Sequence, residues 1–318
     1  WRGELYFEYH RGTLTSVPQI KMNNRKGEFA LMNAELFGVL GVLQGKEYPT
    51  DTLRQDWKLL LLNQFHDILP GSSIEAVYKD SEAQFAKIFA DTERVVEGGM
   101  DLLAGTVRTK GGLLVYNPNG FMENGTVTVD GKTYIAREIP AFGYKVIDKP
   151  SVKNSGVSVQ DRTMENSYYK VIFNEAGGII SLLDKRENRE LVKAGRVLNQ
   201  LSAYQDTPYQ YHNWEMTAYH QQNSWTLNEK AEFASLDEGD RKGFLITKRY
   251  GQSVIRQRVY LYEEGIDRID FVTGRPSASQ GSGYALFAGF EGSHTYPAWL
   301  EGKGRAVKSE LPPRYYGR

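Results

Sequence analysis

The hydrophobic positions of the first third of the chain, from about Asn23 to Gly105, follow the spacing of helices. A first run steps by three and four residues and ends at Gln44-Gly45, which is typical of a helix C-terminus. A second run opens at Thr50 or Asp51 and includes Trp57 and four consecutive leucines. Its wide apolar face predicts a helix at the buried centre of a bundle.

A third helical run opens at Ser72 or Ser73, with Glu75 near the capping-box position, and extends to about Leu103. Its apolar residues again recur at helical spacing. Three helices joined by short connections predict a three-helix bundle.

After Gly105 the pattern changes to short strands separated by turn residues, Asp130-Gly131 being the clearest turn. Frequent strands without intervening helices predict an antiparallel β-sandwich, with a linker from Lys149 to Ser155. The paired runs are Thr126 to Val129 with Lys132 to Ile135, Tyr168 to Phe173 with Ile179 to Leu183, and Phe244 to Tyr250 with Ser253 to Tyr262.

Beyond Thr273 the composition shifts abruptly to Gly, Pro, Ser and Arg without strand alternation. We interpret residues 274–318 as an aberrant tail that follows a frame error or a foreign junction. A divergent native C-terminus is the alternative.

Charge and composition narrow the choice of partners. The 318 residues hold 39 basic and 39 acidic side chains, which removes the electrostatic argument for nucleic acid or an anionic membrane as a partner. A neutral small molecule or sugar fits better. Cysteine is absent, so any metal must be held by His and carboxylate oxygens, and a reducing cytoplasm is compatible with the composition. No apolar run approaches the roughly 20 residues that cross a bilayer.

The pair His66-Asp67 stands where the leucine-rich helical run gives way to Pro70-Gly71. A nitrogen ligand beside an oxygen acceptor at a helix end suits a metal or substrate site at the rim of a cleft. The alternative is that His66 caps the helix and Asp67 opens the turn.

Two further groups suit sugar binding, because aromatic rings stack on sugar faces while charged groups bind hydroxyls. Near the N-terminus Glu4, His10 and Arg11 interleave with aromatic residues, although an ordinary strand with its charges facing water would look alike. The loop from Tyr204 to Trp214 is dense in rings and amides, although a loop packed on a neighbouring domain would look the same. Phosphate-loop, nucleophile-elbow and His-Glu-x-x-His patterns are absent, so kinase, serine-hydrolase and zincin functions lose support.

Several motifs, in this order, resemble glycoside hydrolase family 38 α-mannosidases, and most closely their cytosolic and vacuolar branch. The resemblance is dense from Trp1 to Tyr78 and recognisable to about Thr273. The motifs are Gly3 to Ser16, Asn24-Arg25, Tyr48-Pro49, Trp57-Lys58 and Leu61 to Ser72.

This resemblance implies a retaining exo-α-mannosidase that removes terminal mannose from oligosaccharides. It implies one divalent metal, most often zinc, with cobalt or manganese as alternatives, bound to two adjacent mannose hydroxyls. His66 matches a metal ligand and Asp67 matches an acid that binds the sugar's hydroxyls. Glu4, His10, Arg11 and Trp214 are weaker candidates for substrate binding.

The resemblance also implies a multidomain α+β fold: a β/α-barrel, a three-helix bundle and an antiparallel sandwich of the galactose-mutarotase-like supersandwich type. We expect residues 1–22 to be the edge of the barrel, 23–106 the bundle, 107–273 the sandwich and 274–318 the tail. The family places both catalytic carboxylates upstream of Gly3, so no catalytic residue is expected here. The chain starts with Trp rather than Met, and we expect a fragment that is inactive alone and holds metal weakly.

Two other function classes stay open. One is a non-catalytic carbohydrate-binding β-sandwich with a helical adaptor. The other is a structural scaffold, which requires His66 to be buried against apolar neighbours. One departure weakens a substrate role for the aromatic loop: the family tends to have Trp-Asp-Ala-Trp-Asp where this chain reads Tyr211-His212-Asn213-Trp214-Glu215. Linkage preference and oligomeric state, a homo-oligomer included, are not determined by the sequence.

Overall fold

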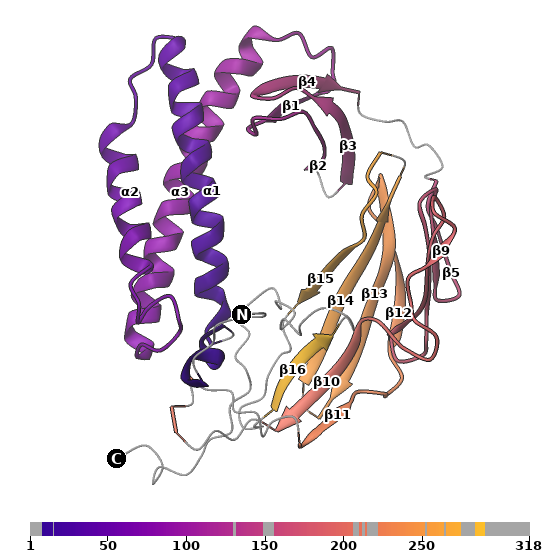
Figure 1. The fold of residues 1–318 in the computed structure, drawn as a ribbon. Coiled ribbons are helices and arrows are strands. Elements are labelled where there is room, and N and C mark those ends of the chain that lie inside the picture. The colour runs from indigo at the N-terminus through magenta and orange to yellow at the C-terminus, as the bar shows by residue number, and fades with distance from the viewer. Residues whose placement is uncertain are drawn as a thin grey trace, which may run out of the picture. The chain divides into compact units, whose positions relative to one another are not determined.

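The computed structural model describes residues 8–14, 16–129, 132–148, 156–205, 210–211, 214, 222–251, 253–263, 265–274 and 284–289. The chain forms two compact units. We call residues 16–123 with 138–149 the helical unit, and residues 1–15, 124–137 and 150–318 the β unit. Figure 1 shows the long helices of the first and the sheets of the second. Among the described residues, no helix combines the length and the apolar character needed to cross a bilayer.

Three helices, α1 (Pro18–Leu43), α2 (Thr50–Asn63) and α3 (Glu75–Thr106), confirm the predicted helical region. Pro18 stands at the first position of α1, where its missing N–H costs nothing. The helices approach closely at Gly27, where a β-carbon would lie 3.0 Å from Leu60 Cδ1. Their shared core consists of Ile20, Leu31, Ala34, Leu53, Leu60, Phe85 and Ile88.

Three details of the helical prediction are wrong. The second helix is not the buried centre of the unit, because Leu61 and Leu62 are 60% and 51% exposed. It also ends at Asn63 rather than at Pro70. The residue before α3 is Ile74 and makes no side-chain capping bond, while the Ser73 hydroxyl donates to the carbonyl of Asp67 instead. The predicted capping box is therefore absent.

Two small sheets follow α3. Strand β1 (Leu113–Asn117) pairs antiparallel with β4 (Gly143–Ile147), and the Tyr116 ring packs 5.0 Å from that of Phe37 on α1. Strands β2 (Glu123–Val129) and β3 (Lys132–Ile139) form the predicted pair, although the Asp130-Gly131 turn lies outside the described residues. The predicted linker, residues 149–155, also lies outside them.

The β unit is built on two antiparallel sheets that share one core. The first joins β5 (Ser158–Gln160), β6 (Thr163–Glu165), β7 (Tyr169–Phe173), β8 (Ile179–Asp184) and β9 (Arg189–Glu190) in sequence order. The second joins β12 (Glu232–Asp237), β13 (Arg241–Tyr250), β14 (Ser253–Tyr262) and β15 (Asp270–Gly274). Phe173 of the first meets Phe244 of the second edge to face, with 6.0 Å between ring centroids. The hairpins predicted at β7–β8 and β13–β14 are confirmed.

A third sheet places β10 (Gln200–Gln205) between β11 (Ser224–Thr226) and β16 (Tyr284–Gly289). Strand β16 pairs antiparallel with β10 over six residues. The expectation that the tail lacks strands is therefore wrong at 284–289. The segment Tyr-Ala-Leu-Phe-Ala-Gly has little polar alternation, but a neighbouring strand supplies backbone partners whatever the side chains are. Residues 275–283 and 290–318 lie outside the described part.

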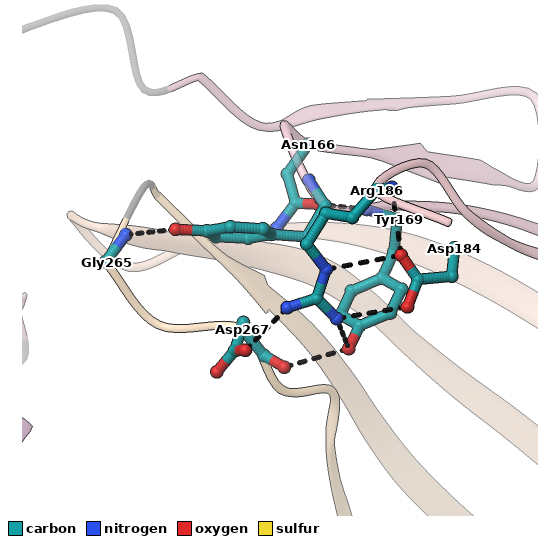
Figure 2. A network of polar contacts seen from close by, with 7 residues as sticks. Asn166, Tyr169, Asp184, Arg186, Gly265 and Asp267 are labelled. Atoms are coloured by element: carbon teal, nitrogen blue, oxygen red, sulfur yellow. Dashed lines mark hydrogen bonds and ion pairs between the residues drawn. The ribbon is translucent and has the colours of Figure 1, made fainter. Parts of the chain in front are cut away.

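An arginine ties the five-stranded sheet to the segment that follows β14 (Figure 2). Arg186 donates to Asp267 over 2.6 Å and to the Tyr169 hydroxyl over 3.0 Å, and it forks onto Asp184. Its guanidinium also lies 5.3 Å from the Tyr168 ring centroid. The carboxylates and the stacked rings use the planar fork of this side chain, which a lysine could not match.

Candidate functional site

The predicted metal and substrate pair lies in the turn between α2 and α3, which we call the His66–Asp67 corner. His66 Nε2 is 3.5 Å from Asp67 Oδ2, and the two side chains are 76% and 47% exposed. The imidazole packs on the Phe65 ring, with 4.1 Å between centroids. Both polar groups therefore reach solvent while their backbone stays in the turn.

Side chains of α1, of α3 and of the turn itself hold the backbone of the turn. Three consecutive carbonyl oxygens of the turn accept hydrogen bonds from side chains. The donors are Ser73 Oγ for Asp67 (2.6 Å), Tyr78 OH for Ile68 (3.4 Å) and Lys21 Nζ for Leu69 (2.8 Å). These bonds satisfy the carbonyls of the turn that carries the pair, and the one from Lys21 joins the turn to α1.

Lys21 of α1 bridges two backbone carbonyls beneath the corner. Its ammonium donates 2.6 Å to the Ser16 carbonyl as well as to that of Leu69. Burial lowers the pKa of Lys21 to about 8, because the charged form loses its hydration. The side chain thus joins the start of α1 to the far end of the turn.

A second link joins α1 to the end of α2. Glu28 accepts hydrogen bonds from Asn24 Nδ2 (3.0 Å) and from Gln64 Nε2 (3.2 Å), and Arg25 forms an ion pair with it at 2.6 Å. The Asn24-Arg25 motif thus orients a carboxylate that holds the C-cap residue of α2.

The structure contradicts two alternative roles of His66, as a helix cap and as a buried core residue. It does not cap α2, because the C-cap residue is Gln64, whose backbone N–H bonds to the carbonyls of Leu60, Leu61 and Leu62. Nor is it buried against apolar neighbours, as a pure scaffold would require, because most of its side chain is exposed.

The donor set at the corner fits part of a metal site. Zinc without cysteine is typically held by about four nitrogen and oxygen donors, and the corner offers an imidazole and a carboxylate. Within the part of the chain that the structure describes, no three His, Asp or Glu side chains gather around one point. The corner alone offers two such donors.

Two of the other predicted substrate residues, His10 and Trp214, lie in the β unit. His10, in the 3₁₀ helix η1 (Glu8–Leu14), meets the Trp214 ring edge-on at 5.3 Å between centroids, and the Gly12 N–H donates to the Trp214 carbonyl over 2.8 Å. Two candidates about 200 positions apart are thus brought together. The strand alternative is wrong for residues 8–14, while Glu4 and the side chain of Arg11 lie outside the described part.

Two family models match the chain over separate segments. The alpha mannosidase middle domain matches residues 8–103, and the glycosyl hydrolases family 38 C-terminal domain matches residues 164–274. The chain belongs to glycoside hydrolase family 38.

Curated relatives from family 38 span far more than this chain. Alpha-mannosidase 2C1 of Homo sapiens is 28% identical over 263 residues, which cover 76% of this chain and 25% of the relative. Alpha-mannosidase of Saccharomyces cerevisiae is 31% identical over 229 residues, which cover 69% and 20%. The chain therefore spans about a quarter of the length of the relatives it matches.

A solved α-mannosidase from Enterococcus faecalis V583 shares the fold, with a TM-score of 0.70 over 88% of this chain and 43% of that chain. At 15% identity, this similarity concerns the backbone arrangement.

Sequence reasoning missed the residues that hold the corner of this family 38 chain, namely Lys21, Glu28 and Tyr78. Lys21 has the weakest signal, since its partners are backbone carbonyls, one of them 48 residues away. Asn24-Arg25 was part of the motif set, but nothing in its sequence indicated that both side chains act on Glu28.

Proposed function

We propose that this chain supplies the middle and C-terminal parts of a retaining exo-α-mannosidase that removes terminal mannose from oligosaccharides. The observation that carries the proposal is the match of two separate segments to family 38 domains. The names of the curated relatives, each an α-mannosidase, support the same activity.

Within this proposal His66 is a metal ligand and Asp67 binds hydroxyls of the mannose. The exposure of the imidazole supports the first role, because a ligand to a shared site must be reachable from outside its own unit. The held backbone of the turn supports the second, because a carboxylate that recognises hydroxyls needs a defined direction.

The metal we propose is zinc, with cobalt or manganese compatible with the same nitrogen and oxygen donors. When bound, it supplies Lewis-acid binding of two adjacent sugar hydroxyls. The two carboxylates of a retaining mechanism, about 5–5.5 Å apart, would come from a catalytic barrel that precedes the matched segments.

We also propose a domain division close to the one expected above, with the first boundary moved from residue 22 to residue 17, because α1 starts at Pro18 and Ile20 belongs to the helical core. Residues 1–17 would complete the barrel edge, the three helices would form the bundle, and the β unit up to residue 273 would form a sandwich of the supersandwich type. The shared core of the two larger sheets supports the sandwich. A cytoplasmic location belongs to the same proposal and follows from the resemblance to the cytosolic and vacuolar branch.

Glu4, His10, Arg11 and Trp214 would border the sugar site. The contact between His10 and Trp214 supports a common location for these two rings. The same contact is also expected if the aromatic loop only packs against the N-terminal segment. A substitution must therefore separate a role in sugar binding from a role in packing.

A chimera tests the proposal. The segment of the Saccharomyces cerevisiae relative that matches this chain is replaced by this chain, and hydrolysis of an aryl α-mannoside and bound zinc are measured. We expect turnover, with the rate falling at least about 100-fold in His66→Ala and in Asp67→Asn. His66→Ala should also lose zinc, while Asp67→Asn should retain more of it.

The 318 residues alone should show no turnover and weak zinc binding. Two outcomes contradict the proposal: hydrolysis by the isolated chain, or full activity of the chimera with His66→Ala. A chimera that stays folded and binds mannose but never hydrolyses would instead favour the carbohydrate-binding sandwich with a helical adaptor.

A further inference from the structure

We propose that Lys21 is a positioning residue for the His66–Asp67 corner. It acts through the backbone of the turn and touches neither of the two side chains. The inference rests on the function proposed above for His66 and Asp67.

Lys21 bonds to the backbone on both sides of a short gap between α1 and the turn. The Lys21 ammonium lies within hydrogen-bond distance of two carbonyl oxygens, those of Ser16 at 2.6 Å and Leu69 at 2.8 Å. One carbonyl precedes α1 and the other follows the corner. A single side chain thus fixes the distance between the start of α1 and the turn.

The two backbone segments that Lys21 bridges also touch each other directly. Gly71, two residues beyond Leu69, lies so close to Ser16 that a β-carbon would stand 2.4 Å from the Ser16 carbonyl oxygen. The Gly71 N–H in turn donates to the Ile68 carbonyl at 3.1 Å. Lys21 therefore bonds to a segment that is already in backbone contact with its other partner.

The backbone of the turn determines the direction of the His66 and Asp67 side chains. Leu69 N–H and Ile68 N–H both donate to the Phe65 carbonyl, at 3.1 and 2.9 Å, so the peptide units on both sides of the corner form one closed turn. His66 and Asp67 lie inside that turn. A shift of the Leu69 carbonyl would rotate the peptide planes from which both side chains project.

Charge supports the same conclusion. The described partners of the Lys21 ammonium are carbonyl oxygens rather than a carboxylate, which is the arrangement expected of a lysine that organises backbone. Burial of a cation without a counter-ion costs free energy, so its retention here points to a role in local order.

The experiment compares Lys21→Met with Lys26→Met in the 318-residue chain. Lys26 is exposed on the same helix and serves as the matched control. Amide hydrogen exchange is measured at Leu69 and Gly71, and the imidazole signals of His66 are followed by NMR without metal. Thermal unfolding of both variants is recorded alongside.

We expect Lys21→Met to speed exchange at Leu69 and Gly71 by about tenfold or more, the effect of losing a hydrogen bond to a charged donor. The His66 signals should shift or broaden, while Lys26→Met stays as the wild type. Should Lys21→Met unfold the helical unit, the shorter Lys21→Gln, which keeps a polar group but cannot span both carbonyls, replaces it under the same criteria.

Unchanged exchange and unchanged His66 signals in the folded Lys21 variant would overturn the inference. Equal changes in Lys26→Met would overturn it too, since they would reflect a general loss of stability. Neither measurement needs mannosidase activity. If the chimera shows no turnover while Lys21→Met still speeds amide exchange in the turn, the result counts against the proposed function and leaves the positioning role of Lys21 standing.

Discussion

A β-carbon placed on Gly71 would stand 2.4 Å from the carbonyl oxygen of Ser16, and the φ angle of Gly71 is +87°. Residue 71 therefore needs to be glycine for two reasons: its backbone is left-handed, and it lies close to the backbone of Ser16. A side chain is disfavoured by the left-handed backbone and has no room beside the Ser16 carbonyl.

Gly71→Ala should destabilise the helical unit by about 2–4 kcal/mol, the sum of left-handed strain and displaced backbone. Gly45→Ala is the matched control, because Gly45 has a φ of +81° with nothing within 4 Å of its β-carbon position. The control should cost about 1 kcal/mol, which is the strain alone. Urea unfolding measures both, and equal losses would show that the approach to Ser16 is unimportant.

A buried aspartate provides the second prediction. Asp56 is fully buried and pairs with Lys87 at 2.9 Å, while Lys87 also bonds to Asp91. Lys87→Met should destabilise the unit by about 3 kcal/mol, because it leaves a buried carboxylate without its cation. Lys79→Met, which breaks an exposed pair with Glu75, should cost less than about 0.5 kcal/mol.

The loss from Lys87→Met should depend on pH. Burial raises the pKa of the Asp56 carboxyl, and Lys87 partly opposes that rise. Without Lys87 the pKa rises further, so the folded state binds the proton more tightly than the unfolded state. The loss is then greatest at neutral pH and shrinks as pH falls toward 4. A loss that stays constant over this range would contradict the mechanism.

The third prediction concerns the network in Figure 2. Arg186→Lys should lower the Tm of the β unit, because lysine cannot reach Asp184, Asp267 and Tyr169 at once. Arg249→Lys, at an exposed pair 3.8 Å from Glu232, should be neutral within about 0.5 kcal/mol. Thermal unfolding compares the two, and equal shifts in Tm would mean that the fork is not used.

The fourth prediction is a rise of stability with pH in the β unit. Lys248 is 7% exposed and donates to the Leu227 carbonyl at 3.0 Å, and burial lowers its pKa from 10.5 to about 8. Between these values the unfolded state holds more protons than the folded state, so stability increases as pH rises. We expect a gain of about 1.5 kcal/mol between pH 8 and pH 9.5 from this group.

Lys248→Met should flatten that rise, whereas Lys230→Met, at an exposed lysine, should leave it unchanged. The range ends at pH 9.5 because burial and hydrogen bonds raise the pKa of Tyr260 and Tyr262, which has the opposite effect on stability above about pH 10. A Lys248→Met variant with the same slope as the wild type would refute the assignment.

Local patterns determined the elements of this protein. Three helical runs and the alternating strands around β7–β8 and β13–β14 were predictable, because amphipathic periodicity and turn residues act over a few positions. Motif order was also sufficient to indicate family 38. These signals are local, and they do not need the rest of the chain to be in place.

Tertiary structure decided what holds the turn that carries His66. Helix α2 ends at Asn63, and the carbonyls of the turn that follows accept hydrogen bonds from Lys21, Ser73 and Tyr78. Hydrogen bonds to a backbone carbonyl leave no signature in the sequence of the acceptor. The contact of His10 with Trp214 and the pairing of β16 with β10 are likewise long-range and depend on the folded chain.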